Sequence, residues 1–165
     1  MPFLQSVLYV AFLGVASHII GEALPRRWFH WEQLPFTAFR WERNGSIYEK
    51  IHIQDWKDHL PDMSRIMKNM VPTRLGMCPT SDDVYLLIQE TCVAETVHFF
   101  LCLLAPVIYW FWKNRVGIWL SCLVIFCNLP FIMIQRYNRP TLVALAARLK
   151  AREERRKNAH THTVS

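Results

Sequence analysis

The sequence lacks the short motifs by which many enzymes are recognised. It has only five glycines among 165 residues, and none belongs to a Gly-rich phosphate loop or to a G-x-S-x-G nucleophile turn. It has no H-x-x-x-x-D motif, and its five cysteines include no C-x-x-C pair. These absences exclude the familiar phosphate-binding and serine-nucleophile loops, and they argue against a zinc site or a disulfide framework.

Charge is almost missing from three long stretches, residues 3–24, 92–112 and 116–134, in a chain that is 52% hydrophobic. At a rise of about 1.5 Å per residue, each stretch could cross a hydrocarbon core of roughly 30 Å as a helix. We therefore predict a mainly α, small integral membrane protein with about three transmembrane helices. The first stretch could instead be a signal peptide, but it lacks a basic n-region and a clear cleavage site before Pro25, which favours a retained helix.

The 19 Lys and Arg residues are unevenly distributed. Nine lie in residues 26–74, eight in residues 136–157, and only two in the link 113–115. The positive-inside rule therefore predicts a multi-pass protein with segment 25–91 and the basic tail 139–165 in the cytoplasm. The net charge of +6 and the basic tail suit anionic lipid headgroups, and without a nucleic-acid motif we expect no nucleic-acid partner.

Local signals divide the segment between the first two apolar stretches. Asn44-Gly45 predicts a turn, and a short helix is expected from Ile47, although the spacing of the isoleucines also allows a strand. Capping residues around Ser81 predict one long helix that runs into the second apolar stretch, with a bend at Pro106.

Pro140 suits the first turn of a new helix after the third apolar stretch. In that helix Leu142, Leu145 and Leu149 would share one face, with basic residues on the other. We therefore predict a separate amphipathic basic helix that lies on the inner leaflet.

Three polar residues of the second stretch, Thr91, Glu95 and His98, are spaced to lie along one helix face. Glu95 and His98 are three residues apart and could hydrogen-bond to each other. Ionisable groups at that depth suggest a functional site, because an unpaired polar group in hydrocarbon costs several kcal/mol. The alternative is that they only hold helices together by hydrogen bonds.

A hairpin between the second and third stretches, turning around Asn114, would place His98 opposite about Pro130 and Glu90 opposite about Asn138. The stretch "NLPFIMIQRYNRP" would then face the Glu/His pair at the cytoplasmic boundary. Its polar residues are Asn128, Gln135, Arg136, Tyr137, Asn138 and Arg139.

These groups fit an acyl transfer reaction. His98, with Glu95 fixing its tautomer, could act as general base toward a hydroxyl group. Arg136 and Arg139 could bind phosphates of an activated donor, or they could be ordinary positive-inside residues. Three side chains could donate to a developing oxyanion: Asn128, Gln135 and Tyr137. Glu95-x-x-His98 resembles half of a di-iron site, but we expect no metal.

Three blocks of the sequence resemble one known family. "NLPFIMIQRYNRPTL" is similar to its Asn-x-Pro-x-x-x-x-Gln-Arg-Tyr-Asn-Arg-Pro block, and "ETCVAETVH" to its Glu-Thr-x-x-Ala-Glu-x-x-His block. A weaker likeness surrounds Trp56 and Lys57 in "DWKDHLPD". The family is that of the glycosyl-4,4′-diaponeurosporenoate acyltransferases of staphyloxanthin-type carotenoid synthesis. Thr141 departs from the family, which has an arginine there.

The resemblance implies a protein of the bacterial cell membrane that esterifies a sugar hydroxyl of a glycosylated C30 carotenoid acid with a fatty acyl group. The donor would be a co-substrate, acyl-CoA or acyl-carrier protein, and no cofactor is expected. Membrane lipids and other carotenoid enzymes are expected partners. Glu95 and His98 are the predicted catalytic pair. The predicted substrate-binding residues are Glu90, Thr91, Asn128, Gln135, Arg136, Tyr137, Asn138, Arg139, Trp56 and Lys57. Two alternatives stay open: an acyltransferase for another glycolipid, and a non-enzymatic scaffold for carotenoid enzymes.

Overall fold

The computed structural model describes residues 1–60 and 79–164, so residues 61–78 of the predicted cytoplasmic segment lie outside it. Its long helices are α1 (Pro2–Ala23), α3 (Ser81–Leu104) and α5 (Arg115–Val164). The short elements are the 3₁₀ turns η1 (Arg26–Trp28), η2 (Arg40–Ile51), η3 (Lys57–His59) and η5 (Ala105–Val107), and the helices α2 (Ile53–Trp56) and α4 (Ile108–Trp112). The described part of the chain has no strand, which confirms the mainly α prediction.

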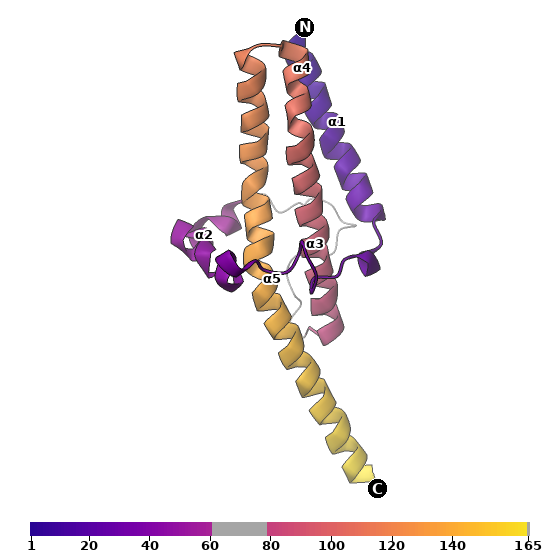
Figure 1. Ribbon diagram of the computed structural model, residues 1–165. Helices are drawn as coiled ribbons and strands as arrows, with labels where there is room; N and C mark the ends of the chain where they lie inside the picture. Colours follow the sequence, from indigo (N-terminus) through magenta and orange to yellow (C-terminus); the bar gives the residue numbers. More distant parts are fainter. Residues whose placement is uncertain (61–78, 165) are drawn as a thin grey trace.

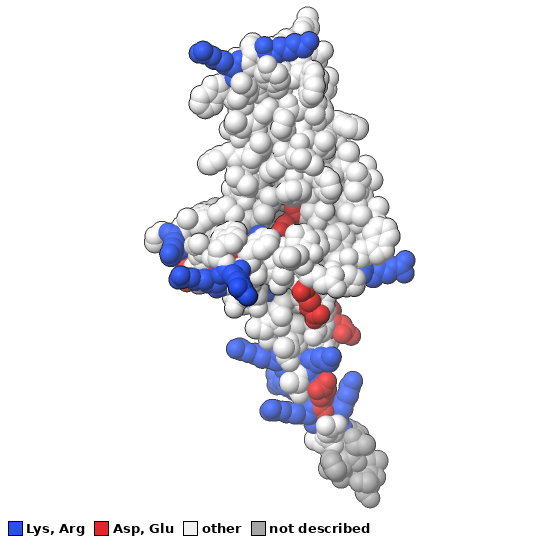
Figure 2. Space-filling view, in the orientation of Figure 1, with Lys and Arg blue, Asp and Glu red and all other residues white. Residues whose placement is uncertain are grey.

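Three helical segments are long and apolar enough to cross a membrane: Pro2–Ala23, Ser81–Trp112 and Arg115–Ala159. They confirm the prediction of about three membrane-length helices. Figure 1 shows α3 with α4 between α1 and α5, and the N-terminus at the same end as the α4–α5 link. In Figure 2 the Lys and Arg side chains gather at that end and in the lower half, and an uncharged band separates them.

The first helix packs against the second apolar segment near their shared end. The Trp112 indole N–H donates to Ser6 Oγ (2.9 Å), and the Tyr9 hydroxyl donates to the Leu104 carbonyl (2.9 Å). The first apolar stretch is therefore a packed member of the helical bundle.

The start of α3 follows the capping signal. The Asp83 N–H donates to Thr80 Oγ1 (3.2 Å), and the Thr80 N–H donates to the Asp83 carboxylate (2.9 Å). This reciprocal pair gives hydrogen-bond acceptors to two backbone N–H groups that would otherwise have none at the start of the helix. At the far end, Pro106 lies in the 3₁₀ turn η5 between α3 and α4, where a bend was predicted.

The predicted break at Pro140 is wrong, because α5 runs without interruption through Pro130 and Pro140. The predicted basic C-terminal helix is present, but as the continuation of α5 past the start of α3 and not as a separate helix (Figure 1). Packing explains the difference. Ala146 is fully buried against Val84 and Ile88 of α3, and the three leucines predicted to face lipid pack around this cluster.

A side-chain contact extends this packing further along α5. Glu153 accepts hydrogen bonds from the Ser81 N–H (2.9 Å) and from the Ser81 hydroxyl (2.7 Å). The first turn of α3 thus covers the apolar face of α5 that the sequence pattern assigned to lipid.

The segment η2 contains the predicted Asn44-Gly45 turn. Arg43, Asn44 and Gly45 all have positive φ, with 91° at Gly45. The short helix expected from Ile47 is present as the second part of η2, which is 3₁₀-helical up to Ile51, and the α-helical turn α2 follows from Ile53. A Cβ added at Gly45 would lie 3.3 Å from the Tyr137 carbonyl oxygen, so the absence of a side chain lets η2 approach the α5 backbone.

Candidate active site

The antiparallel α3–α5 hairpin brings His98 to the level predicted for it. His98 Nδ1 lies 2.8 Å from Asn128 Oδ1, and the imidazole stacks on Phe131 with ring centroids 4.6 Å apart. The two contacts lie on either side of Pro130, the residue that the hairpin register predicted.

Asn128 fixes the tautomer of His98. Asn128 Nδ2 donates to the Val124 carbonyl (2.8 Å), so its Oδ1 is the atom that faces the imidazole. Because an amide oxygen only accepts, Nδ1 of His98 must carry the proton and Nε2 keeps its lone pair. No hydrogen bond within the described residues engages Nε2.

The predicted hydrogen bond between Glu95 and His98 does not form. Glu95 instead accepts from Arg136 Nη1 (2.5 Å) and from Arg139 Nη2 (2.6 Å). Both arginines come from the next helix, and their full charges attract the carboxylate more strongly than a neutral imidazole does.

Glu42 from η2 completes what we call the ion-pair network, which consists of Glu42, Arg136, Glu95 and Arg139. Arg136 donates to Glu42 through Nε (2.5 Å) and Nη2 (2.8 Å), so the charges alternate along the network and sum to zero. Glu42 is 1% exposed and Arg139 4%. The network therefore joins α3, α5 and the η2 segment in one buried cluster.

Arg136 uses every donor it has within this cluster. Besides its bonds to Glu42 and Glu95, it donates to the carbonyls of Pro35 (2.9 Å) and Thr37 (3.2 Å). These are five hydrogen bonds from the five N–H groups of a guanidinium. In this conformation none remains for a donor phosphate, the role that the sequence suggested for Arg136.

Arg139 is engaged in a similar way. It donates to the hydroxyl of Thr91 (2.9 Å), to the carbonyl of Thr91 (3.2 Å) and to the carbonyl of Phe36 (2.6 Å), in addition to Glu95. Thr91, predicted to bind substrate, thus contacts α5.

Glu42 is stabilised as a carboxylate. Burial alone would raise its pKa, but hydrogen bonds from Arg136, the Tyr48 hydroxyl (2.5 Å) and the Phe39 N–H (2.7 Å), with the charge of Arg136, bring the pKa below its ordinary value. For Tyr48, burial and then the hydrogen bond to Glu42 raise the pKa above its ordinary value. Glu42 therefore stays ionised and Tyr48 stays protonated at neutral pH.

The remaining predicted site residues lie around this cluster. Glu90 does not join the facing arginines of α5: it pairs with Arg26, just after α1, at 2.6 Å. Tyr137 accepts from Gln54 (2.9 Å) and lies under the Lys57 ammonium, 5.1 Å from the ring centre.

Lys57 also reaches Asn138 at 3.5 Å, whereas the Trp56 indole donates to the Ile51 carbonyl (3.0 Å) inside its own segment. For Gln135 the described residues provide no hydrogen-bond partner. The weaker block of the resemblance thus meets the stronger one through Lys57, Tyr137 and Asn138.

A cleft of about 540 Å³ opens between residues 31–44 and α5, and Glu42, Arg136 and Arg139 form part of its wall. Within residues 1–60 and 79–164, no group of three or more His, Cys, Asp or Glu side chains could hold a metal ion. The geometry therefore offers an oriented imidazole and a cleft lined partly by neutralised charges.

Sequence reasoning missed Glu42, Tyr48 and Arg26. Charge balance was the available signal for Glu42, because two arginines at an apolar boundary need more than the one carboxylate of Glu95. Nothing in the local sequence indicates which of several acidic residues supplies the second charge.

The structure is that of a small helical protein with three membrane-length segments, an oriented histidine in the second and a neutral ion-pair network beside it. A family model described as glycosyl-4,4′-diaponeurosporenoate acyltransferase matches residues 25–148. The chain belongs to this family, and it is therefore an enzyme of the acyltransferase class.

Curated relatives support the assignment. The glycosyl-4,4′-diaponeurosporenoate acyltransferases of Staphylococcus aureus strains bovine RF122 / ET3-1 and MRSA252 are each 31% identical to this chain over 145 residues. The alignments cover 87% of this chain and 86% of each relative. The protein of that name from strain N315 is 30% identical over the same length. No solved structure matches the chain.

Proposed function

We propose that this protein esterifies a sugar hydroxyl of a glycosylated C30 carotenoid acid with a fatty acyl group. The acyl donor is a thioester co-substrate, acyl-CoA or acyl-carrier protein, and the reaction requires no cofactor. The names of the relatives support the acceptor and the reaction class. The reaction takes place at the cytoplasmic face of a bacterial cell membrane, which the distribution of Lys and Arg supports.

The tautomer of His98 is the observation that carries this proposal. Asn128 holds the Nδ1 proton, so Nε2 is available as a base about one helical turn inside the ion-pair network. Nε2 takes the proton of the sugar hydroxyl while its oxygen attacks the thioester carbonyl. The new C–O bond forms, the C–S bond breaks, and the imidazolium returns the proton to the departing thiolate.

Gln135 is the proposed donor to the oxyanion that develops on the carbonyl oxygen. It lies seven residues from Asn128, on nearly the same face of α5, and side chains on a helix lean toward its N-terminus. We infer from this lean that the Gln135 amide reaches toward the level of His98. Unlike Asn128, it has no hydrogen bond to another described residue, so both of its N–H groups can serve the reaction.

The ion-pair network acts as a positioning element in this proposal. It fastens residues 35–48 to α3 and α5, and so holds the cleft wall in place. Glu95 contributes through its two arginines, since both of its oxygens accept from them. Tyr137 and Asn138, which both contact Lys57, are proposed with it as contacts for the sugar.

The test is acyl transfer by purified protein in lipid nanodiscs, with a glycosylated C30 carotenoid acid and an acyl thioester. His98→Ala should abolish detectable ester formation, because general base catalysis typically contributes about 10²–10⁴-fold. The matched control is His18→Ala, which removes the histidine of α1 that pairs with Glu22. Undiminished esterification by His98→Ala, with a folded protein, would remove His98 from the mechanism.

Asn128→Ala separates a positioning role from a purely structural one. Without the amide, the Nδ1 proton is no longer held, and the fraction of His98 in the productive tautomer falls. We expect kcat to fall while KM for the acceptor changes little, and we expect the pH profile of kcat to shift. A changed KM with unaltered kcat would show that Asn128 does not orient the base.

The scaffold alternative is favoured by one observation, the saturation of Arg136 by protein acceptors, which suits a purely structural cluster. If it is correct, purified protein forms no ester with any glycolipid, while pigment esterification in cells needs a second protein. Replacing the carotenoid glucoside by other glycolipids in the same assay distinguishes the remaining alternative, a different acceptor.

A further inference from the structure

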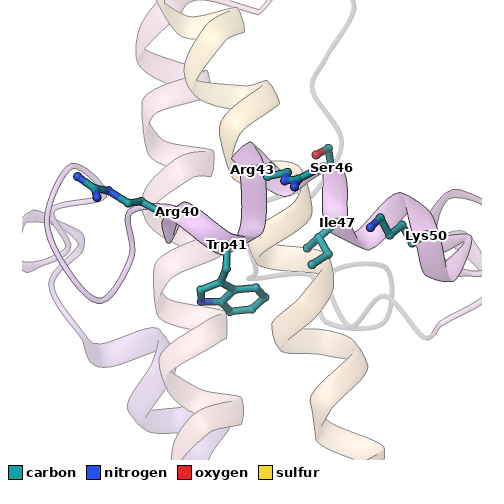
Figure 3. Close-up of a pocket in the computed structure, with 6 residues that line it drawn as sticks. All are labelled: Arg40, Trp41, Arg43, Ser46, Ile47 and Lys50. Carbon is teal, nitrogen blue, oxygen red and sulfur yellow. The ribbon is translucent and has the colours of Figure 1, made fainter.

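A second hollow, of about 430 Å³, lies on the outer side of η2. It is lined by Arg40, Trp41, Arg43, Ser46, Ile47 and Lys50, and we call it the basic pocket. Figure 3 shows Arg43 and Ser46 close together, with Lys50 directed toward them past Ile47, whereas Arg40 extends from the other side of Trp41. The pocket therefore combines cationic heads, a hydroxyl and apolar surface.

The cations of the basic pocket differ from those of the ion-pair network in having no acidic partner. Arg40, Arg43 and Lys50 are exposed, and none of the carboxylates whose side chains the structure describes pairs with them. Arg136 and Arg139 are neutralised by Glu42 and Glu95. The positive charge available to an anionic ligand near the cleft is thus on the outer face of η2.

Phosphate is the anion that this set of side chains fits. Guanidinium groups bind phosphate oxygens through parallel N–H donors, and a hydroxyl and an ammonium add further donors. Arg43 and Lys50 together carry more positive charge than one phosphodiester neutralises, so a ligand with several phosphate charges is favoured over a single phospholipid headgroup.

Trp41 points to the rest of the ligand. Its side chain is 59% exposed, and its ring stacks on Phe39 with centroids 6.1 Å apart and an angle of 10° between the planes. An exposed indole held flat by a neighbouring ring offers a face on which a purine base can stack. Phosphates together with a purine indicate a nucleotide.

The pocket is also placed to deliver a substrate to His98. Glu42, which lies between Trp41 and Arg43 in the chain, faces the other way and pairs with Arg136. Arg136 is five residues along α5 from Phe131, the ring that stacks on His98, which corresponds to about 8 Å of helix rise. A nucleotide on the outer face of η2 would therefore have its flexible thioester arm within reach of the base.

We propose that the basic pocket binds the nucleotide phosphates of a coenzyme-A-type acyl thioester, the acyl donor of this enzyme. The inference rests on the proposed acyl transfer and specifies its donor. The acyl chain enters the apolar part of the bundle while the nucleotide stays at the polar boundary.

The test measures binding without turnover. Desulfo-coenzyme A, which cannot carry an acyl group, is titrated into the full chain in nanodiscs of neutral lipid. We expect saturable binding that weakens with salt. Arg43→Ala/Lys50→Ala should raise the Kd by about tenfold or more, because hydrogen bonds to charged groups are among the stronger ones.

The matched control, Arg152→Ala/Arg155→Ala, removes the same charge from an exposed part of α5 and should leave the Kd unchanged. Equal weakening by both double variants would mean that only the overall charge matters, and it would overturn the proposal. Absence of saturable binding to the unaltered chain would overturn it as well.

Two further arms identify the source of the phosphate. If anionic lipid in the nanodisc displaces the probe while neutral lipid does not, the pocket is a headgroup site and the proposal is wrong. If acyl-carrier protein supports turnover and acyl-CoA does not, the proposal is also wrong. His98→Ala should keep the wild-type Kd, so intact binding without ester formation would reject the proposed function of His98 and leave the nucleotide site standing.

Discussion

Replacing Glu42 by glutamine tests how strongly the ion-pair network holds the η2 segment. Glu42 is 1% exposed and accepts hydrogen bonds from Arg136, Tyr48 and the Phe39 N–H. The substitution preserves size but turns a neutral cluster into one with a net positive charge. Removing one partner of a buried pair typically costs about 3–5 kcal/mol, because the other charge stays buried without compensation. We expect a destabilisation of that size.

The assay has a global and a local readout. Thermal unfolding of purified Glu42→Gln in nanodiscs reports the loss of stability, and limited trypsin digestion at Arg40 and Arg43 reports release of η2. Glu49→Gln is the matched control, because Glu49 is an exposed carboxylate of the same segment.

The expected result is earlier unfolding and faster cleavage for Glu42→Gln alone. If both variants unfold and are cleaved like the unaltered chain, the buried charge of Glu42 does not hold η2 and our account of the network is wrong. A double-mutant cycle with Arg136→Gln then measures the coupling energy between the two residues. We expect the double variant to lose less stability than the sum of the losses in the two single variants.

Two further predictions concern the same region. Gly45→Ala should destabilise the protein by about 1–2 kcal/mol, because a side chain disfavours its φ of 91° and would approach the Tyr137 carbonyl; unchanged thermal unfolding would refute the close approach. The pKa of Glu42 is lowered on folding, so its contribution is complete above the ordinary value of 4.5 and is lost as the pH falls through the folded-state pKa. The stability difference between the unaltered chain and Glu42→Gln should therefore shrink in acid, and a difference that is constant with pH would contradict this assignment.

Several features of the fold could be read from local sequence. Three uncharged stretches of bilayer length predict three long helices, since a chain in hydrocarbon must satisfy its backbone internally. The capping pair Thr80 and Asp83 predicts where α3 begins, because both partners lie within one helical turn. The level of His98 against α5 follows from counting residues equally on both sides of a short link. The sequence blocks that resemble the acyltransferase family were enough to indicate the family.

The same reasoning failed where distant residues compete. From local sequence alone, Pro140 predicts a helix boundary. The helix α5 nevertheless continues through it, because α3 covers the apolar face of α5. Glu95 lies one turn from His98, yet two arginines more than forty positions away bind it instead. The reason in both cases is that burial and charge pairing depend on distances in space.

Helix length, polarity and termini thus follow from residues that are neighbours in the chain, because the forces behind them act within a turn or average over a stretch. Which side chains pair with each other across the fold does not follow from neighbours in the chain. Glu42 and Arg136 are separated by 94 positions, and only the docking of η2 against α5 makes them a pair. That docking also leaves the cations of the basic pocket on the exposed side of η2, and the pairing of α3 with α5 sets Asn128 beside His98. The assignment of the candidate site therefore rests on the folded arrangement.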